Sequence, residues 1–160
     1  MSPTFPQRLV GKKTILIAED DPNDVFLLQW AFSKTGLNAN LRFVEDGEAA
    51  IRYLESSDQQ KNPTPNLLLL DLKMPRLDGF NVLEWVRLQP GLKRLLVIVL
   101  TSSDSLLDIN HAYDLGANSY LVKPFYNEHL IKLVEHLQSY WLDINFAPEC
   151  EPTQLHRIAA

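Results

Sequence analysis

The stretch Leu67-Leu68-Leu69-Leu70-Asp71-Leu72-Lys73-Met74-Pro75-Arg76-Leu77-Asp78-Gly79 decides the fold of this chain. An unbroken apolar run that is bounded by turn residues predicts a short strand buried on both faces. Asp71 then lies at the carboxyl end of this strand, and open parallel sheets bind their ligands beyond that end. Aspartate is also common after strands because it suits turns. From this stretch alone, Asp71 is either a residue that takes part in chemistry or a residue that forms a turn.

Further apolar runs predict four more strands, at residues 14–18, 41–44, 95–100 and 120–122. A helical pattern follows each of the five strands. These patterns begin near Pro22, Gly47, Gly79, Leu107 and Asn127, and they end before Gly36, Ser56, Gln89 and Gly116 and at Trp141. Parallel strands are joined by crossovers, and the crossovers here are helical. We therefore expect an α/β fold, with a single doubly wound five-stranded parallel sheet sandwiched by five helices.

The length and composition of the chain predict one domain. The chain has 160 residues, of which 46% are hydrophobic and 22% charged, and this is enough for one sizeable core. Residues 1–12 contain two prolines and no periodicity, so we expect a flexible leader there. The domain is expected at residues 13–141, followed by a C-terminal extension at residues 142–160.

Charge and cysteine usage exclude several classes of partner. The formal net charge is −5 and the basic residues are spread along the chain, which gives no electrostatic footprint for nucleic acid. The single cysteine, Cys150, can form neither an internal disulfide nor a thiolate metal cage. The first residues lack the apolar core of a signal peptide, and the longest purely apolar run is too short to span a bilayer. We expect a cytoplasmic protein that binds neither nucleic acid nor membrane.

The ends of four predicted strands have residues suited to chemistry: Glu19 with Asp20, Asp71, Thr101 and Lys123. Parallel topology brings these ends to one edge of the sheet. Clustered carboxylates repel one another unless a cation lies among them, and oxygen ligands without histidine or cysteine suit Mg²⁺. With a lysine and a hydroxyl, the set can neutralise a phosphoryl group while a carboxylate attacks it in line. Each residue alone also fits a helix cap, a turn or a solvated lysine, but their joint placement favours phosphoryl transfer to Asp71.

Four segments resemble the receiver domain of two-component response regulators, which has a flavodoxin-like fold. They are residues 15–21 (ILIAEDD), 70–79 (LDLKMPRLDG), 100–102 (LTS) and 120–125 (YLVKPF). The resemblance covers roughly residues 12–141. It implies that Asp71 accepts a phosphoryl group from a sensor histidine kinase, and that the protein is a signalling phosphoprotein and not an enzyme, assisting only its own phosphorylation and dephosphorylation.

The resemblance implies a metal site as well. Asp20, Asp71 and the backbone carbonyl of Lys73 would hold Mg²⁺, with Glu19 bonding through water and with Mn²⁺ or Ca²⁺ able to substitute. Position 73, two residues after the acceptor, is often small or neutral in the family, and here it is lysine. Its ammonium can either hinder the hydrolytic water or point to solvent.

Further residues take roles by the same resemblance. Thr101, Ser102 and Lys123 would bind the phosphoryl oxygens, and Pro124 is a candidate for a cis peptide bond. Thr101 and Tyr120 resemble the family's switch pair, in which the hydroxyl moves to the phosphoryl group and the aromatic ring turns inward. The alternative for Tyr120 is a partly buried strand aromatic.

Residues 113–115 and 140–142 are similar to the stand-alone regulators of bacterial and cyanobacterial phytochrome kinases. This implies a phytochrome-type histidine kinase upstream. Only 19 residues follow Trp141, too few for an effector module, so we expect output by contact with a downstream protein target or a phosphorelay partner.

Those relatives tend to dimerise through the fourth helix, the fifth strand and the last helix. Tyr140, Trp141, Ile144 and Phe146 offer an apolar surface for such a homodimer. The alternative is that the tail folds back over its own last helix.

Three other functions fit parts of the pattern. A Mg²⁺-dependent phosphatase also uses a strand-end aspartate, but it normally needs a second acid two residues later, where this chain has Lys73. A degenerate receiver would act as a phosphorylation-independent adaptor, although every required residue type is present. A flavodoxin-like cofactor protein is disfavoured, because the acidic turn after the first strand would repel the phosphate of FMN.

Overall fold

The computed structural model describes residues 11–57 and 61–150. Most of the predicted leader and the last ten residues of the predicted extension lie outside the described residues. Strands and helices alternate along the chain, as predicted. The strands are β1 (Lys13–Ala18), β2 (Ala39–Val44), β3 (Leu67–Leu70), β4 (Leu96–Thr101) and β5 (Ser119–Val122). The helices are α1 (Pro22–Lys34), α2 (Gly47–Glu55), α3 (Gly79–Leu88), α4 (Leu106–Asp114) and α5 (Asn127–Leu137), which runs on into a π-helical segment, η1 (Gln138–Ile144).

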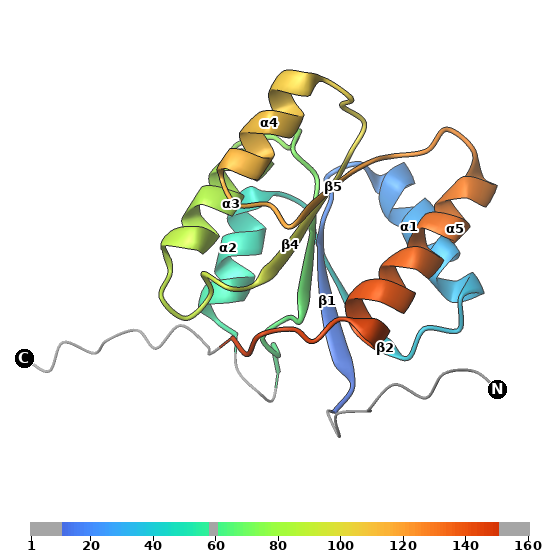
Figure 1. Ribbon diagram of the computed structural model, residues 1–160, viewed down its shortest axis with the longest axis horizontal. Coiled ribbons are helices and arrows are strands. Elements are labelled where there is room, and N and C mark those ends of the chain that lie inside the picture. Colours follow the sequence, from blue (N-terminus) through green and yellow to red (C-terminus); the bar gives the residue numbers. More distant parts are fainter. Residues whose placement is uncertain (1–10, 58–60, 151–160) are drawn as a thin grey trace, which may run out of the picture.

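The strands form one parallel sheet in the order β2-β1-β3-β4-β5. In Figure 1, α1 and α5 cover one face of this sheet, and α2, α3 and α4 cover the other. The predicted doubly wound sheet sandwiched by five helices is therefore confirmed. Its order places β3 at the centre, so the carboxyl end of β3 has a neighbouring strand end on each side.

Two hydrophobic clusters fill the space between the sheet and its helices. The first cluster lies on the α2, α3 and α4 side and includes Leu68 and Leu70, whereas the second lies on the α1 and α5 side and includes Leu67 and Leu69. Successive side chains of a strand point to opposite faces, so the four leucines of β3 serve both clusters. None of them is more than 1% exposed, which confirms the predicted burial on both faces.

Aspartate side chains begin three of the helices. Asp21, Asp46 and Asp78 precede α1, α2 and α3, and each accepts a hydrogen bond from a backbone N–H in the first turn, at 2.8, 2.7 and 2.9 Å. Such caps satisfy donors that the helix itself leaves unpaired. Pro22 occupies the first helical position of α1, as predicted, where its missing N–H costs nothing.

The end of the last helix differs from the expectation. The predicted helix reaches Trp141 with α geometry, but α5 ends at Leu137 and the chain continues in the wider turn of η1. Leu137 and Leu142 are both buried although they are five residues apart, a spacing that fits the π-helical repeat. Tyr140, which lies in η1 between these two buried leucines, is 51% exposed.

The chain beyond η1 crosses the amino-terminal edge of the sheet, as Figure 1 shows. Ala147 packs against the second cluster and Cys150 packs against the first, so this segment contacts both layers. In the part of the chain that the structure describes, no helix is long and apolar enough to cross a membrane.

Candidate functional site

The carboxyl edge of the sheet holds the residues that the sequence singled out. Sheet hydrogen bonding continues one residue beyond the strands there. The backbone N–H of Glu19 donates to Val44, that of Asp71 donates to Ala18, and that of Lys123 donates to Thr101, at 3.0, 3.1 and 2.7 Å. These bonds fix the backbone from which each functional side chain projects.

Three carboxylates meet at this edge. Glu19, Asp20 and Asp71 each offer an oxygen atom, and these atoms lie within 4.8 Å of one another. Glu19 and Asp71 are only 3% and 7% exposed, whereas Asp20 is exposed. A compact set of oxygen donors with one open side suits a hard divalent cation that keeps several waters. The residues present therefore fit the predicted metal site.

Lys123 lies among these acids. Its Nζ atom is 2.5 Å from Glu19 Oε2, 2.7 Å from Asp24 Oδ2 and 3.2 Å from Asp71 Oδ2. The side chain is 15% exposed, so these ion pairs are largely shielded from water and are stronger than surface pairs. Lys123 is thus in direct contact with Glu19 and with the candidate acceptor, Asp71.

Burial and charge shift the pKa values of two of these groups in the metal-free protein. Burial raises the pKa of Glu19 to about 7, because desolvation of its carboxylate outweighs the hydrogen bond from Lys123. Burial lowers the pKa of Lys123, but the hydrogen bonds to Asp24 and Glu19 and the charge of Asp71 outweigh it, so the pKa is raised on balance. Lys123 therefore stays an ammonium at neutral pH.

Asp24 is a member of this site that the sequence did not single out. It lies in the first turn of α1, where an acid is also expected for its favourable interaction with the helix dipole. The sequence does contain a signal for Asp24. It lies three residues after Asp21, and α1 must begin at the edge of the sheet where the strand-end residues meet. The sequence pattern alone gives no direction to its side chain.

The predicted switch residues lie on β4, which neighbours β3, and on β5, the next strand along the sheet. Thr101 at the end of β4 is fully buried, and its hydroxyl oxygen has no hydrogen-bond partner within the described residues. Tyr120 of β5 is half-buried, and its hydroxyl donates to the backbone carbonyl of Ser103 at 2.9 Å. The side chain of Ser103 in turn donates to Asp108 of α4 at 2.6 Å. Ser102, the other predicted phosphoryl ligand, is exposed.

The prediction of a cis peptide bond before Pro124 is wrong, because the described residues contain no cis peptide bond. The trans form of a bond before proline is the more stable one by about 0.5–1 kcal/mol. With this bond trans, the backbone N–H of Lys123 still completes its bond to Thr101 and the side chain still reaches Asp71. The site thus needs no cis bond to direct the lysine.

Lys73 lies in the loop that follows β3. Its backbone N–H donates to Asp71 Oδ1 at 3.4 Å, and its side chain is exposed. The role of its backbone carbonyl as a metal ligand stays a prediction. The neighbours Leu72 and Met74 are buried, so the loop is anchored on either side of the lysine.

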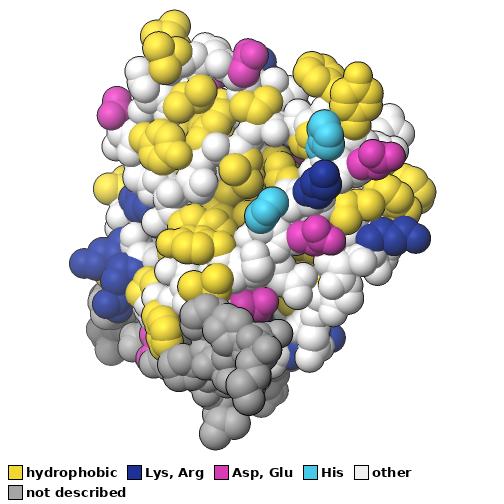
Figure 2. All heavy atoms as spheres, turned by 45° about the vertical axis from the view of Figure 1, so that its right-hand side comes forward, with side chains coloured by type: hydrophobic (Ala, Val, Ile, Leu, Met, Phe, Trp, Pro, Cys, Tyr) yellow, Lys and Arg dark blue, Asp and Glu magenta, His cyan; other side chains and the backbone are white. Residues whose placement is uncertain are grey.

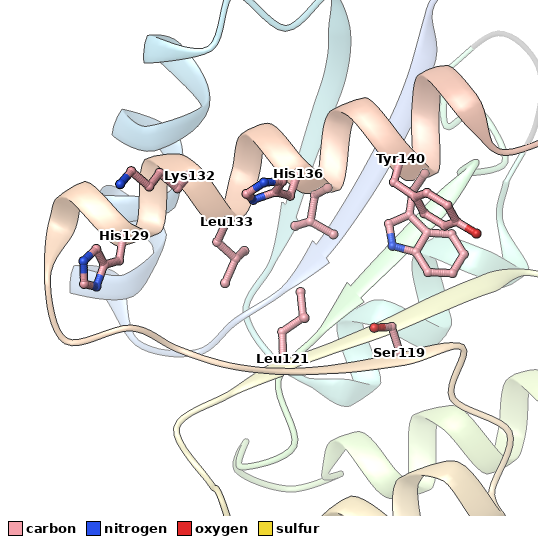
Figure 3. Close-up of a pocket in the computed structure, with 9 residues that line it drawn as sticks. Ser119, Leu121, His129, Lys132, Leu133, His136 and Tyr140 are labelled. Atoms are coloured by element: carbon pink, nitrogen blue, oxygen red, sulfur yellow. The ribbon is translucent and has the colours of Figure 1, made fainter.

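A groove lies between β5 and α5, away from Asp71. It has a volume of about 650 Å³ and is lined by both apolar and basic side chains. In Figure 3, Leu121 of β5 and Leu133 of α5 point toward each other across it. On the face turned forward in Figure 2, hydrophobic side chains gather beside histidine side chains.

Two of the four predicted dimer residues, Tyr140 and Trp141, line this groove, and the four differ in their exposure. Trp141 lines the groove, is partly buried and packs against the second cluster. Tyr140, Ile144 and Phe146 are 51%, 41% and 67% exposed. The chain after α5 therefore packs on its own domain and also leaves apolar surface uncovered.

Residues 15–135 match the family described as Response regulator receiver domain. Two relatives cover most of this chain. The probable methanogenesis regulatory protein FilR2 of Methanothrix harundinacea (strain 6Ac) is 37% identical over 134 residues, which are 84% of this chain and 86% of the relative. Response regulator Rcp1 of Synechocystis sp. (strain ATCC 27184 / PCC 6803 / Kazusa) is 38% identical over 132 residues, which are 82% of this chain and 90% of the relative.

Solved structures give the same result. The phosphorylated cyanobacterial phytochrome response regulator RcpA superposes with a TM-score of 0.80 at 34% identity, covering 87% of this chain and 100% of that chain. The Mn²⁺-bound form of Rcp1 superposes with a TM-score of 0.76 at 37% identity, covering 85% of this chain and 99% of that chain. The sheet edge described above therefore belongs to a fold for which a phosphorylated form and a metal-bound form are known.

Proposed function

Because the chain belongs to the response regulator receiver domain family, we propose that Asp71 accepts a phosphoryl group from a histidine kinase and that the protein signals by the resulting conformational switch. One observation supports this most directly. Asp71 Oδ2 lies 3.2 Å from the ammonium of Lys123, and the oxygens of Asp71, Glu19 and Asp20 lie within 4.8 Å of one another. A nucleophile, a fixed cation and a metal-binding pair are the parts that phosphoryl transfer requires.

The transfer itself is a displacement at phosphorus. A carboxylate oxygen of Asp71 forms a bond to the phosphorus atom, and the bond between phosphorus and the imidazole nitrogen of the kinase histidine breaks. The electron pair of that bond stays with the imidazole, which takes up a proton. Lys123 neutralises charge on the transferred oxygens, and the buried position of Asp71 keeps the carboxylate aimed and poorly solvated.

Glu19, Asp20, Asp71 and the backbone carbonyl of Lys73 are the groups that would hold Mg²⁺, with Mn²⁺ or Ca²⁺ able to replace it. The cation would supply positive charge against the phosphoryl oxygens. The chemistry of the donor set supports a hard cation, and the Mn²⁺-bound form of Rcp1 supports Mn²⁺ as one of the cations that the site can take.

Thr101 and Tyr120 are the proposed switch. The hydroxyl of Thr101 lacks a hydrogen-bond partner within the described chain, so an acceptor on Asp71 would give it one. Tyr120 is connected to α4 by hydrogen bonds through Ser103 and Asp108, so a movement of Tyr120 would reach the surface of α4. Phosphorylation shifts the population of two arrangements only by the difference in their interactions with the new group.

The alternatives to a phosphorylated signalling domain have less support. A phosphatase needs a general acid near the leaving group, and the residue two positions after Asp71 is the exposed Lys73. A phosphorylation-independent adaptor would not need the contacts among Lys123, Glu19 and Asp71. Both features favour a response regulator that is not an enzyme acting on other molecules.

A phytochrome-type histidine kinase is the proposed upstream partner. The similarity to RcpA, a cyanobacterial phytochrome response regulator, over its whole length supports this choice. The downstream partner is proposed to be a protein, either an output target or a phosphorelay component. The acidic net charge and the lack of a basic cluster argue against direct binding of nucleic acid.

A second copy of the chain is the proposed partner for the apolar surface near η1. Tyr140, Ile144 and Phe146 leave rings and an aliphatic side chain exposed there, and Tyr140 also lines the groove between β5 and α5. Sedimentation of wild type and Phe146→Ala, with and without beryllofluoride, tests this, because Phe146 is the most exposed of the three side chains. A dimer that is unchanged by the substitution would contradict the proposal.

The central experiment is incubation with acetyl phosphate and Mg²⁺ followed by intact mass measurement of wild type and Asp71→Asn. The expected result is one added phosphoryl group on wild type and none on the variant. Wild type that gains no mass would overturn the proposed function.

A further inference from the structure

The ammonium of Lys123 has one partner that belongs to neither the proposed acceptor nor the acidic metal cluster. This partner is Asp24, whose Oδ2 atom lies 2.7 Å from Lys123 Nζ. Asp71 is more distant, at 3.2 Å. The resting lysine is therefore held at least as closely by an acid of α1 as by the residue on which it is proposed to act.

The three ion pairs use the full donor capacity of the lysine. An ammonium group has three N–H donors and no acceptor, and Lys123 contacts three carboxylates. A phosphoryl group on Asp71 brings several strong acceptor oxygens to the same place. Lys123 can donate to more than one of them only if another carboxylate gives up its hydrogen bond.

Asp24 is the partner best placed to give up that bond. Its side chain is 34% exposed, whereas those of Glu19 and Asp71 are 2% and 8% exposed. Water can solvate the carboxylate of Asp24 once Lys123 moves away, but a buried carboxylate without its cation is costly. Glu19 also lies in the acidic cluster, so its separation from Lys123 would disturb the metal site.

We propose that Asp24 is a positioning residue that binds the ammonium of Lys123 in the resting state and competes for it with the phosphoryl group on Asp71. This inference rests on the proposed function. The negative charge of Asp24 acts in the same direction as the competition, because it repels an anion on Asp71. Asp24 thus shifts the balance toward the unphosphorylated form.

The pKa of Lys123 agrees with this geometry. Burial lowers it, and the strongest of the opposing effects is the hydrogen bond to Asp24, followed by that to Glu19. An acid in the first turn of a helix ordinarily interacts favourably with the helix dipole. If this were the whole role of Asp24, its replacement would leave anion binding at Asp71 unchanged.

Beryllofluoride, an analogue of the phosphoryl group, tests the inference by calorimetric titration at saturating Mg²⁺. The variants are Asp24→Asn and, as a matched control, Asp21→Asn. Asp21 loses the same charge from the same end of α1, its side chain does not contact Lys123, and asparagine caps helices as well as aspartate does. Asp24→Asn is expected to bind beryllofluoride about three- to tenfold more tightly than Asp21→Asn, which is the size of one partly shielded ion pair. Asp24→Glu is expected to restore the wild-type affinity.

The outcomes separate the two proposals. If wild type binds no beryllofluoride, the proposed function fails. If wild type binds it but Asp24→Asn binds no more tightly than Asp21→Asn, only the role of Asp24 is overturned. In the metal-free protein, ¹⁵N spectra are expected to give faster hydrogen exchange of the Lys123 ammonium in Asp24→Asn than in wild type, and equal exchange would contradict the resting-state contact.

Discussion

Gly79, the first residue of α3, lies directly against the backbone carbonyl of Asp71, and a β-carbon on Gly79 would collide with that oxygen. The backbone N–H of Gly79 donates to Leu72 at 3.0 Å, so the two segments are also joined by a hydrogen bond. The helix thus begins in contact with the acceptor's own peptide group, and only glycine permits so close an approach.

Gly79→Ala is therefore expected to displace Asp71 as well as to destabilise the protein. Overpacking of this kind costs about 1–3 kcal/mol, and a displaced nucleophile reacts more slowly. Urea unfolding and the rate of phosphorylation by acetyl phosphate measure the two effects. Gly11→Ala is the control, because a β-carbon there meets no atom within 4 Å. Equal phosphorylation rates for the two variants would argue against the contact.

Thr101→Val is expected to stabilise the metal-free protein. The substitution keeps the shape of the side chain and removes a buried hydroxyl that has no partner within the described residues, and an unpaired hydroxyl costs about 1–3 kcal/mol. The same substitution is expected to weaken beryllofluoride binding, whereas Thr101→Ser keeps the hydroxyl and should retain it. Urea unfolding and calorimetry make these measurements. A valine variant that is less stable than wild type would contradict this account of Thr101.

Lys73→Asn is expected to lose its phosphoryl group faster than wild type. The exposed ammonium of Lys73 projects from the residue two after Asp71, where it can hinder the hydrolytic water. Removal of one exposed charge is expected to change the rate of dephosphorylation by about two- to fivefold, because exposed charges interact weakly. Intact mass measured at intervals after removal of the phosphoryl donor gives the rate. Equal or faster loss from wild type would show that the lysine points away from the reaction.

Cys150 provides a prediction on pH. Burial raises the pKa of its thiol, and the charges of Arg94 and Arg87 offset this only in part. The folded protein therefore holds the neutral thiol more strongly than the unfolded chain does. The stability that this group contributes is fully present below the ordinary thiol pKa and is lost as the pH rises through the higher folded value.

Alkylation by iodoacetamide at pH 8 should thus be slower for the folded protein than for the same protein in urea, because the thiolate is the reactive form. The folded protein's rate should still increase at a pH where the unfolded rate has levelled off. Equal rates in the two states at pH 8 would mean that Cys150 does not pack against the first cluster in solution.

The sheet and most of the site were predictable because both depend on periodicity and on strand ends. A run such as Leu67–Leu70, followed by a helical pattern, is typical of a strand in the interior of a parallel sheet, and the residues after such strands meet at one edge. Glu19, Asp71 and Lys123 follow from that rule, since each comes directly after a strand.

The features that sequence did not predict depend on side-chain direction and local helical geometry. Asp24 lies on a helix, where an acid in the first turn has an ordinary explanation, and its contact with Lys123 depends on how α1 meets the sheet. The change from α5 to η1 alters the helical repeat within a few residues, so a constant period does not predict that α geometry ends at Leu137. The Pro124 expectation failed because the lysine reaches its partners through a trans bond.

The segment after η1 contacts both hydrophobic clusters at the amino edge of the sheet, through Ala147 and Cys150. The segment is covalently joined to α5 through η1, and it packs on the layer of α2, α3 and α4 through Cys150, so it opposes sliding of one layer over the other. At the carboxyl edge, side-chain ion pairs of Lys123 join α1 to the ends of β1, β3 and β5. A phosphoryl group on Asp71 can rearrange these ion pairs, but it lies at the opposite edge from the packing of Ala147 and Cys150. Motion that begins at Asp71 should therefore be small at the amino edge, and displacements of the helices should grow toward the carboxyl edge.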